Sequence, residues 1–282
     1  MKQYQQAIDY YQKALKILQE TDHHQFRANS LIGLGRTYNS LGEYQQAIDY
    51  FQRSLPIYRE IGDCTNESES LCNLGNAYRS LKQYQQAIDY YQQALKVLQE
   101  TDHRQFRANS LIGLSRTYNS LGEYQQAIDC YQQLLPIHRE IGHRGNEAAT
   151  LGNLGNANNS LGQYEQAINY YQQSLTIYRE IGDRSGEAQS LQNLAQLYNL
   201  IGRIKEGYVV VFQATQIQRK LGLPVEAWAI PKWVKPIGKF AQRGKLQLGL
   251  CFLLGFFAFP FALVFIVSSM LWGVVKYQLL RR

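Results

Sequence analysis

The ten residues QYQQAIDYYQ, beginning at Gln3, decide how this chain folds because they return at a fixed interval. They reappear as EYQQAIDYFQ at Glu43, QYQQAIDYYQ at Gln83, EYQQAIDCYQ at Glu123 and QYEQAINYYQ at Gln163, each copy 40 residues after the last. A repeat of this length indicates an array of similar units, each of which buries its apolar face against a neighbouring unit.

Each unit contains two apolar segments with the period of an α-helix. In the first, residues 28–42, the apolar side chains are spaced by three or four positions: Leu31, Leu34, Tyr38 and Leu41. In the second, residues 43–62, they are Tyr44, Ala47, Ile48, Phe51 and Leu55. Both segments end in a glycine, Gly42 and Gly62, which readily adopts the positive φ of a helix C-terminus. The unit is therefore predicted to be an antiparallel helix pair.

Small residues recur at matching places in the units. The second helix carries Ala47, Ala87, Ala127 and Ala167, and the first carries Gly35, Gly75 and Gly155. Small side chains let two helices approach closely enough for the neighbouring Tyr and Leu side chains to interlock. The repeated phrase thus encodes helix packing.

This pattern resembles the tetratricopeptide repeat, whose signature is matched in order by Leu31, Leu34, Gly35, Tyr38, Gly42, Tyr44, Ala47 and Phe51. The 40-residue period is similar to the variant in Pins/LGN-type scaffolds and kinesin light chains. The resemblance implies an all-α, right-handed superhelical solenoid of antiparallel helix pairs over residues 1–222. It contains about five and a half units, because Met1 aligns with the middle of a unit and the first helix of the first unit is missing. Either the natural start lies upstream, or an uncovered helix face is offered to a partner.

Several positions depart from the pattern: Asn158 replaces the first-helix Tyr, Ser115 and Ala195 replace Gly, Lys82 replaces the turn Gly, and Gly207 replaces the second-helix Ala. The last unit is rich in Val, and an atypical terminal unit is expected to cap a solenoid. Pro56 and Pro136 lie inside second helices. Since proline removes a backbone hydrogen bond and clashes with the preceding turn, we expect a kink or local break at both.

The resemblance places the first helices on the concave face, where a peptide runs along the channel. The polar side chains predicted to line it are Arg36, Asn39, Asn73, Asn76, Arg79, Arg116, Asn119, Asn153, Asn156, Asn159, Asn193 and Gln196. Asn carboxamides both donate to and accept from a peptide backbone, and arginines hold carboxylates bidentately. The alternative is a merely solvated helix face, which is polar whatever the function.

Charge and motifs argue against other classes of protein. Residues 1–230 carry 21 basic and 22 acidic side chains, so the folded repeats lack the basic surface that nucleic acid requires. The histidines and cysteines show no metal-ligand spacing, and the chain has no phosphate-binding loop or nucleophile elbow. We expect no cofactor, no metal and no enzyme activity.

The C-terminal part has a different composition. Residues 223–245 form a basic linker with Pro and Trp, residues 246–276 include 28 uncharged residues from Leu248 to Val275, and residues 277–282 form a short basic tail. The uncharged stretch predicts a single transmembrane helix, with re-entry at Pro260 as the alternative. Five basic residues precede it and three follow it, which favours the repeats on the cytoplasmic side. The basic flank is also suited to contact with anionic lipid.

These features predict a membrane-anchored scaffold that binds a peptide or protein partner along its concave face without catalysis. Two alternatives remain open at this point: a structural protein that stacks head-to-tail through its units as a homo-oligomer, and a regulatory subunit of a larger complex.

Overall fold

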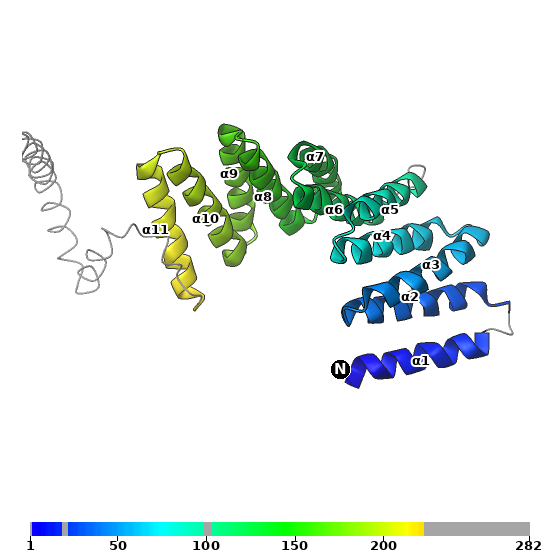
Figure 1. The fold of residues 1–282 in the computed structure, drawn as a ribbon. Coiled ribbons are helices and arrows are strands. Elements are labelled where there is room, and N and C mark those ends of the chain that lie inside the picture. Colours follow the sequence, from blue (N-terminus) through cyan, green and yellow to red (C-terminus); the bar gives the residue numbers. More distant parts are fainter. Residues whose placement is uncertain (1, 19–21, 99–102, 223–282) are drawn as a thin grey trace, which may run out of the picture. The chain divides into compact units, whose positions relative to one another are not determined.

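The computed structural model describes residues 2–18, 22–98 and 103–222, and every element in these ranges is an α-helix (Figure 1). The helices are α1 (Lys2–Leu18), α2 (His24–Ser40), α3 (Tyr44–Glu60), α4 (Cys64–Ser80), α5 (Tyr84–Val97), α6 (Arg104–Leu121), α7 (Tyr124–Ile141), α8 (Arg144–Ser160), α9 (Tyr164–Glu180), α10 (Arg184–Leu200) and α11 (Ile204–Lys220). The expected linker, membrane span and tail, residues 223–282, lie outside the described residues. Among the described helices, none combines the length and the apolar composition needed to cross a bilayer.

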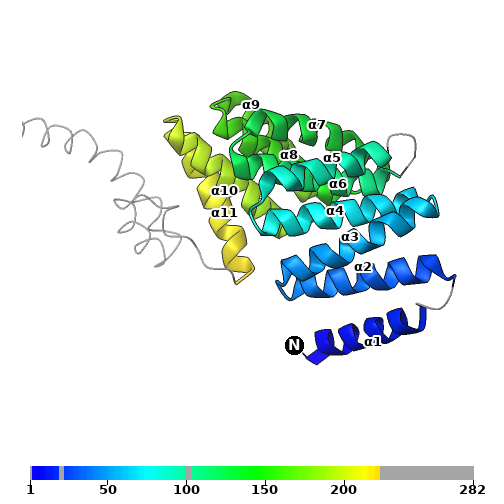
Figure 2. The same cartoon turned by 45° about the vertical axis from the view of Figure 1, so that its right-hand side comes forward.

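Consecutive helices pack against one another in pairs, as predicted. The first helices of the units are α2, α4, α6, α8 and α10, and each packs on the second helix that follows it. Each second helix then packs on the first helix of the next unit, and α4 also contacts α6 directly. Figures 1 and 2 show the resulting row of helix hairpins, which is the all-α solenoid expected from the repeat.

The turns between helices confirm the glycine stops. Gly42 and Gly62 have φ values of 81° and 71°. Lys82 occupies the same turn position with φ 60°, and it is the only described residue other than glycine with a positive φ. The turn closes in the same way with either residue: the amide N–H of Glu43 donates to the carbonyl of Tyr38, and that of Gln83 to Tyr78, both at 2.9 Å.

Close approach explains the small residues. A Cβ atom added to Gly35 would lie 2.4 Å from the ring of Phe51, and one added to Gly155 would lie 2.5 Å from the ring of Tyr171. Ala47 and its three counterparts in α5, α7 and α9 are completely buried. The aromatic rings of the second helices therefore fill the space that the glycines of the first helices leave open.

We expected a kink or a local break at the two prolines; the break is wrong, and the kink stays a prediction. α3 continues through Pro56 and α7 continues through Pro136. Pro56 leaves the carbonyl of Gln52 without its helical N–H donor, and Pro136 does the same to the carbonyl of Gln132. Both prolines and both glutamines are exposed. Because water can solvate these carbonyls, the missing hydrogen bond does not interrupt the helix.

The expectation that the last unit caps the array also needs correction. The outer surface of α11 exposes Ile204, Val209 and Phe212, each by more than half of its area. A capping unit presents a polar outer face instead, which keeps a solenoid soluble.

Candidate peptide-binding groove

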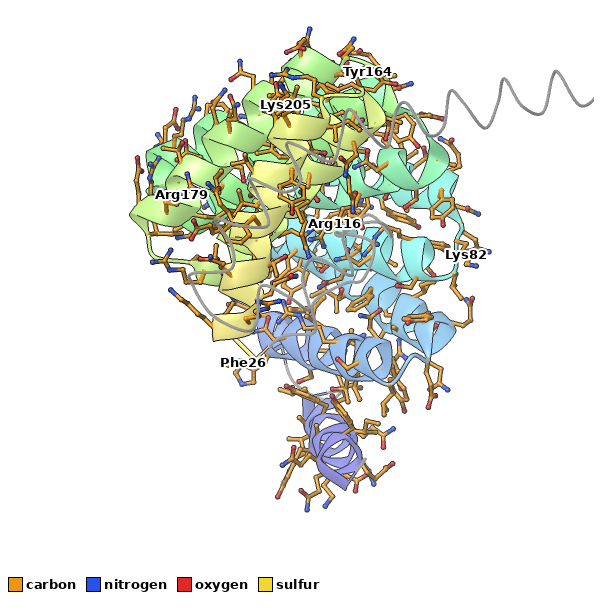
Figure 3. All side chains as sticks on the ribbon, turned by 90° about the vertical axis from the view of Figure 1, so that its left-hand side faces the viewer. Phe26, Lys82, Arg116, Tyr164, Arg179 and Lys205 are labelled. Atoms are coloured by element: carbon orange, nitrogen blue, oxygen red, sulfur yellow. The ribbon has the colours of Figure 1, made fainter. Side chains whose placement is uncertain are left out.

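The side chains predicted to bind a partner do lie on the first helices, and the part of this surface between α4 and α6 is hollowed into a cleft of about 250 Å³. We call it the α4–α6 cleft. It is lined by Ser68, Glu69, Cys72, Asn73, Asn76, Arg79, Phe106, Asn109, Ile112, Gly113 and Arg116. Figure 3 shows Arg116 toward the middle of the view, with helices of the array around it. The structure thus brings Asn73, Asn76, Arg79 and Arg116 together.

Two guanidinium groups give this cleft a positive charge. Neither Arg79 nor Arg116 forms an ion pair within the described part of the chain. Nε of Arg79 and Nδ2 of Asn73 are both buried and lack a hydrogen-bond acceptor among the described residues. Since an unsatisfied buried donor is costly, these two groups indicate that an acceptor belongs in or beside the cleft.

The other titratable side chains at this cleft remain neutral near pH 7. Burial raises the pKa of Tyr91 to about 12, although the nearby Arg79 and Arg116 act in the opposite direction. Burial also raises the pKa of the Cys72 thiol to about 11. The charge of the cleft is therefore set by the two arginines and Glu69.

A second cleft, of about 400 Å³, lies between α1, α2, α3 and α4, and Arg36 and Glu69 both line it. The Arg36 guanidinium pairs with the Glu69 carboxylate on the next first helix. Arg36 was predicted to hold a partner's carboxylate, but its charge is already balanced by this chain. Glu69, which lines both clefts, had not been predicted.

Three of the predicted asparagines form hydrogen bonds with tyrosine hydroxyls of the second helices. The hydroxyl of Tyr91 donates to Oδ1 of Asn76 at 2.8 Å, and that of Tyr171 donates to Oδ1 of Asn156 at 2.7 Å. Nδ2 of Asn119 instead donates to the hydroxyl of Tyr131 at 2.8 Å. These contacts orient the carboxamides, so the asparagines serve the packing of the unit as well as its inner surface.

The remaining predicted residues lie apart from the α4–α6 cleft. Oδ1 of Asn39 and of Asn159 are buried without a donor in the described residues. Asn193 accepts from Nε2 of Gln189 at 3.0 Å and donates to Asn156 at 3.4 Å, which links α10 to α8. Asn153 is half-buried and Gln196 is exposed. The predicted residues therefore share one register of the first helices, and four of them, Asn73, Asn76, Arg79 and Arg116, meet in the α4–α6 cleft.

The sequence analysis did not predict Glu69, Phe106, Asn109 and Ile112, which also line this cleft. Glu69 precedes Asn73 by four residues and Asn76 by seven, and Asn109 precedes Arg116 by seven. Residues with these spacings share one face of a helix, so the predicted face could have been extended by one turn toward each N-terminus. The apolar members, Phe106 and Ile112, carry no such signal.

Sequence comparison agrees with the geometry of the helix pairs. The tetratricopeptide repeat family profile matches residues 1–60, 66–140 and 146–206. No curated protein sequence matches the chain. Within the described residues, no group of three or more His, Cys, Asp or Glu side chains is arranged to hold a metal ion.

Solved structures with the same fold include BtubC (BKLC) from P. vanneervenii, which is 17% identical with a TM-score of 0.68 over 78% of this chain and 92% of that chain. A putative kinesin light chain with nearly identical TPR-like repeats from Podosopora anserina is 22% identical, with a TM-score of 0.62 over 71% and 99% of the two chains. The apo form of RapI is 18% identical, with a TM-score of 0.68 over 75% and 59%. At these identities the likeness concerns the fold alone. Because the family profile covers more than half of its length, the chain belongs to the tetratricopeptide repeat family.

Proposed function

We propose that this protein is a non-catalytic scaffold whose inner face binds an extended peptide, with an acidic side chain of the peptide seated between Arg79 and Arg116. The observation that carries the proposal is the pair of guanidiniums that have no ion-pair partner among the described residues, next to the donors of Arg79 and Asn73 that find no acceptor there. A carboxylate supplies several acceptor positions and a negative charge, which matches both features.

The walls of the α4–α6 cleft support a peptide rather than a free anion. Phe106 and Ile112 provide apolar contact, while the carboxamides of Asn76 and Asn109 face the same space. A bound peptide needs both kinds of contact, because its backbone must be hydrogen-bonded and its side chains must be desolvated. Because the helices of the array are already folded, most of the conformational entropy lost on binding is lost by the peptide.

The test is the affinity of the full-length protein for short labelled peptides that differ at one position, Glu, Gln or Lys, measured by fluorescence polarisation. Arg116→Asn installs the residue found at the matching position of α4 and α8, so the fold is preserved. It should weaken binding of the Glu peptides roughly tenfold, the effect of one charge-assisted hydrogen bond.

Arg53→Gln is the matched control, since Arg53 lies exposed on the outer helix α3 beside Asp49. It removes the same charge and should leave the affinity unchanged. Equal losses in the two variants, or an equal affinity for Glu and Gln peptides, would refute a specific carboxylate site in the cleft.

We also propose that residues 246–276 anchor the scaffold in a membrane, with the repeats on the cytoplasmic side. The support is the run of 28 uncharged residues, the aromatic residues Trp233, Trp272 and Tyr277 near its ends, and the greater number of basic residues before it.

Phe256→Arg combined with Leu263→Arg places two charges near the centre of the run. If the anchor is real, this double variant shifts the protein from the carbonate-resistant membrane fraction to the soluble fraction, because each charge is costly there. Unchanged fractionation would contradict it.

A further inference from the structure

The polar side chains of the α4–α6 cleft offer mainly hydrogen-bond donors. Oδ1 of Asn76 accepts from the hydroxyl of Tyr91 at 2.8 Å, and Oδ1 of Asn109 accepts from Nε2 of Gln105 at 3.2 Å. What each carboxamide still offers a ligand is therefore mainly its NH2 group. Nδ2 of Asn73 is buried and has no acceptor among the described residues. A ligand that only accepts hydrogen bonds thus fits this cleft better than one that also donates them.

The cleft carries two positive charges that the described part of the chain does not balance. Glu69 is the one acidic side chain among the described residues that line it, and Glu69 pairs with Arg36 of α2, outside the cleft. The guanidiniums of Arg79 and Arg116 have no ion-pair partner among the described residues. A single carboxylate of a peptide would balance one of these charges and leave the other.

The guanidinium of Arg79 is held in place by a buried phenol. The ring of Tyr91 is completely buried, and it fills the space beside Gly75 and Gly113, where an added Cβ would lie 2.7 Å and 2.3 Å away. Burial raises the pKa of Tyr91 to about 12, and a hydrogen bond from Arg79 acts in the opposite direction. Nε of Arg79 still lacks an acceptor among the described residues. The cleft therefore presents a positioned cation with an unused donor.

A phosphate monoester matches both the charge and the donors of this cleft. At pH 7 it carries about −1.5 to −2 charges and three acceptor oxygens, whereas a carboxylate carries one charge and two oxygens. Guanidinium groups bind phosphate oxygens bidentately. Phe106 and Ile112 add apolar walls, which suit the residues that flank a phosphorylated side chain but give nothing to a free phosphate ion.

From these observations we infer that the side chain seated between Arg79 and Arg116 is a phosphorylated residue of the partner peptide, so that tight binding requires phosphorylation of the partner. The inference rests on the proposed function, because it names the acidic side chain that the inner face binds. A glutamate at the same place is then a weaker mimic of the phosphorylated residue. An unmodified acidic peptide and free phosphate are the competing ligands.

The first experiment measures the affinity of the full-length protein for labelled peptide pools by fluorescence polarisation in phosphate-free buffer. The pools have randomised flanks and carry phosphoserine, Ser, Glu or Gln at the centre. The phosphoserine pool should bind roughly tenfold more tightly than the Glu pool, the effect of one further charge-assisted hydrogen bond. If phosphoserine binds no more tightly than Glu while Glu still exceeds Gln, this inference fails and the proposed function stands. Equal affinities for all four pools would overturn both.

Two variants locate the phosphate, Arg79→Asn and Arg116→Asn. They install the residue found at the matching positions of other first helices: Asn39 and Asn119 for the first, Asn76 and Asn156 for the second. Either variant should weaken binding of the phosphoserine pool roughly a hundredfold and of the Glu pool roughly tenfold, because one remaining guanidinium balances only one charge. The control Arg53→Gln should keep the preference for phosphoserine. A preference that survives in both cleft variants would place the phosphate elsewhere and overturn the inference.

A last pair of measurements separates a peptide ligand from a free anion. Inorganic phosphate at the concentration of the phosphoserine pool should leave the labelled pool bound, because it makes no contact with Phe106 and Ile112. Displacement at equal concentration would overturn the inference. In NMR spectra the Nε–H resonance of Arg79, assigned by its loss in Arg79→Asn, should move downfield when the phosphoserine pool is added, since this donor gains an acceptor. An unmoved resonance would contradict the proposed contact.

Discussion

Replacing Gly155 by Ser tests how the aromatic rings and the asparagines are coupled. A Cβ atom at this position would lie 2.5 Å from the ring of Tyr171, so the ring must move. The unit with Ser115 indicates where it goes: there the hydroxyl of Tyr131 meets Asn119, whereas the hydroxyl of Tyr171 meets Asn156, three positions earlier in the register. In Gly155→Ser we therefore expect Tyr171 to move to the residue that matches Asn119.

That residue is Asn159, whose Oδ1 is buried and has no donor among the described residues. The variant thus exchanges one hydrogen bond for another. Overpacking costs about 1–3 kcal/mol, and Ser is a better helix former than Gly by roughly 0.5 kcal/mol. The expected net loss of unfolding free energy is about 1 kcal/mol, because the new hydrogen bond at Asn159 offsets the one lost at Asn156.

Gly75→Ser is the matched comparison. Its Cβ would lie 2.7 Å from the ring of Tyr91, and that ring also fills the space at Gly113, where a Cβ would lie 2.3 Å away. The residue in the register of Asn159 is Arg79, which donates but cannot accept, so Oδ1 of Asn76 loses its donor without replacement. The expected loss is about 2 kcal/mol, one net hydrogen bond more.

The assay is urea unfolding of the two variants and the parent protein, followed by circular dichroism at the helix band. Both glycines lie in interior units, so the difference between the variants reports on the local packing. The reasoning fails if Gly155→Ser is as destabilising as Gly75→Ser, or if a structure of Gly155→Ser still shows Tyr171 bonded to Asn156.

Other predictions concern the turns, the buried carboxylates and the thiols. Lys82→Gly relieves the left-handed backbone of Lys82 (φ 60°) and should raise the unfolding free energy by roughly 0.5–1 kcal/mol, measured by urea unfolding; no gain would contradict it. Burial tends to raise the pKa of the Glu147 and Glu187 carboxyls, but the hydrogen bonds of two arginines to each outweigh it and lower both values. Their contribution to stability should be present above the unfolded pKa of about 4.3 and lost as pH falls through the folded values; a double Gln variant should flatten an acid titration of stability in that window. Maleimide at pH 8 should label the exposed Cys64 far faster than the buried Cys72, whose pKa is raised to about 11, and equal rates before denaturation would exclude the packing at Cys72.

Local pattern determined much of this protein in advance. The spacing of apolar residues, the glycine stops and the recurring Ala and Gly positions predicted helix pairs and their order, while the binding face on the first helices was implied by the resemblance to the tetratricopeptide repeat and stays a prediction. These features depend on residues within one or two helical turns, and the backbone geometry of a helix makes such relations regular. The break expected at Pro56 and Pro136 was wrong, because the outcome depends on whether the freed carbonyls face water, which the local sequence does not show.

Only the tertiary structure decided which polar side chains are free to bind. Arg36 looked equivalent to Arg116, but Glu69, 33 residues away, neutralises one and not the other. Asn76 looked exposed, but the hydroxyl of Tyr91 holds it. Hydrogen bonds and ion pairs act over about 3 Å between groups that are distant in sequence, so periodicity, which places a residue on a face, does not reveal its partner there. The helix array follows from the 40-residue repeat, while the charged cleft between α4 and α6 arises from a few first-helix positions at which neighbouring units differ.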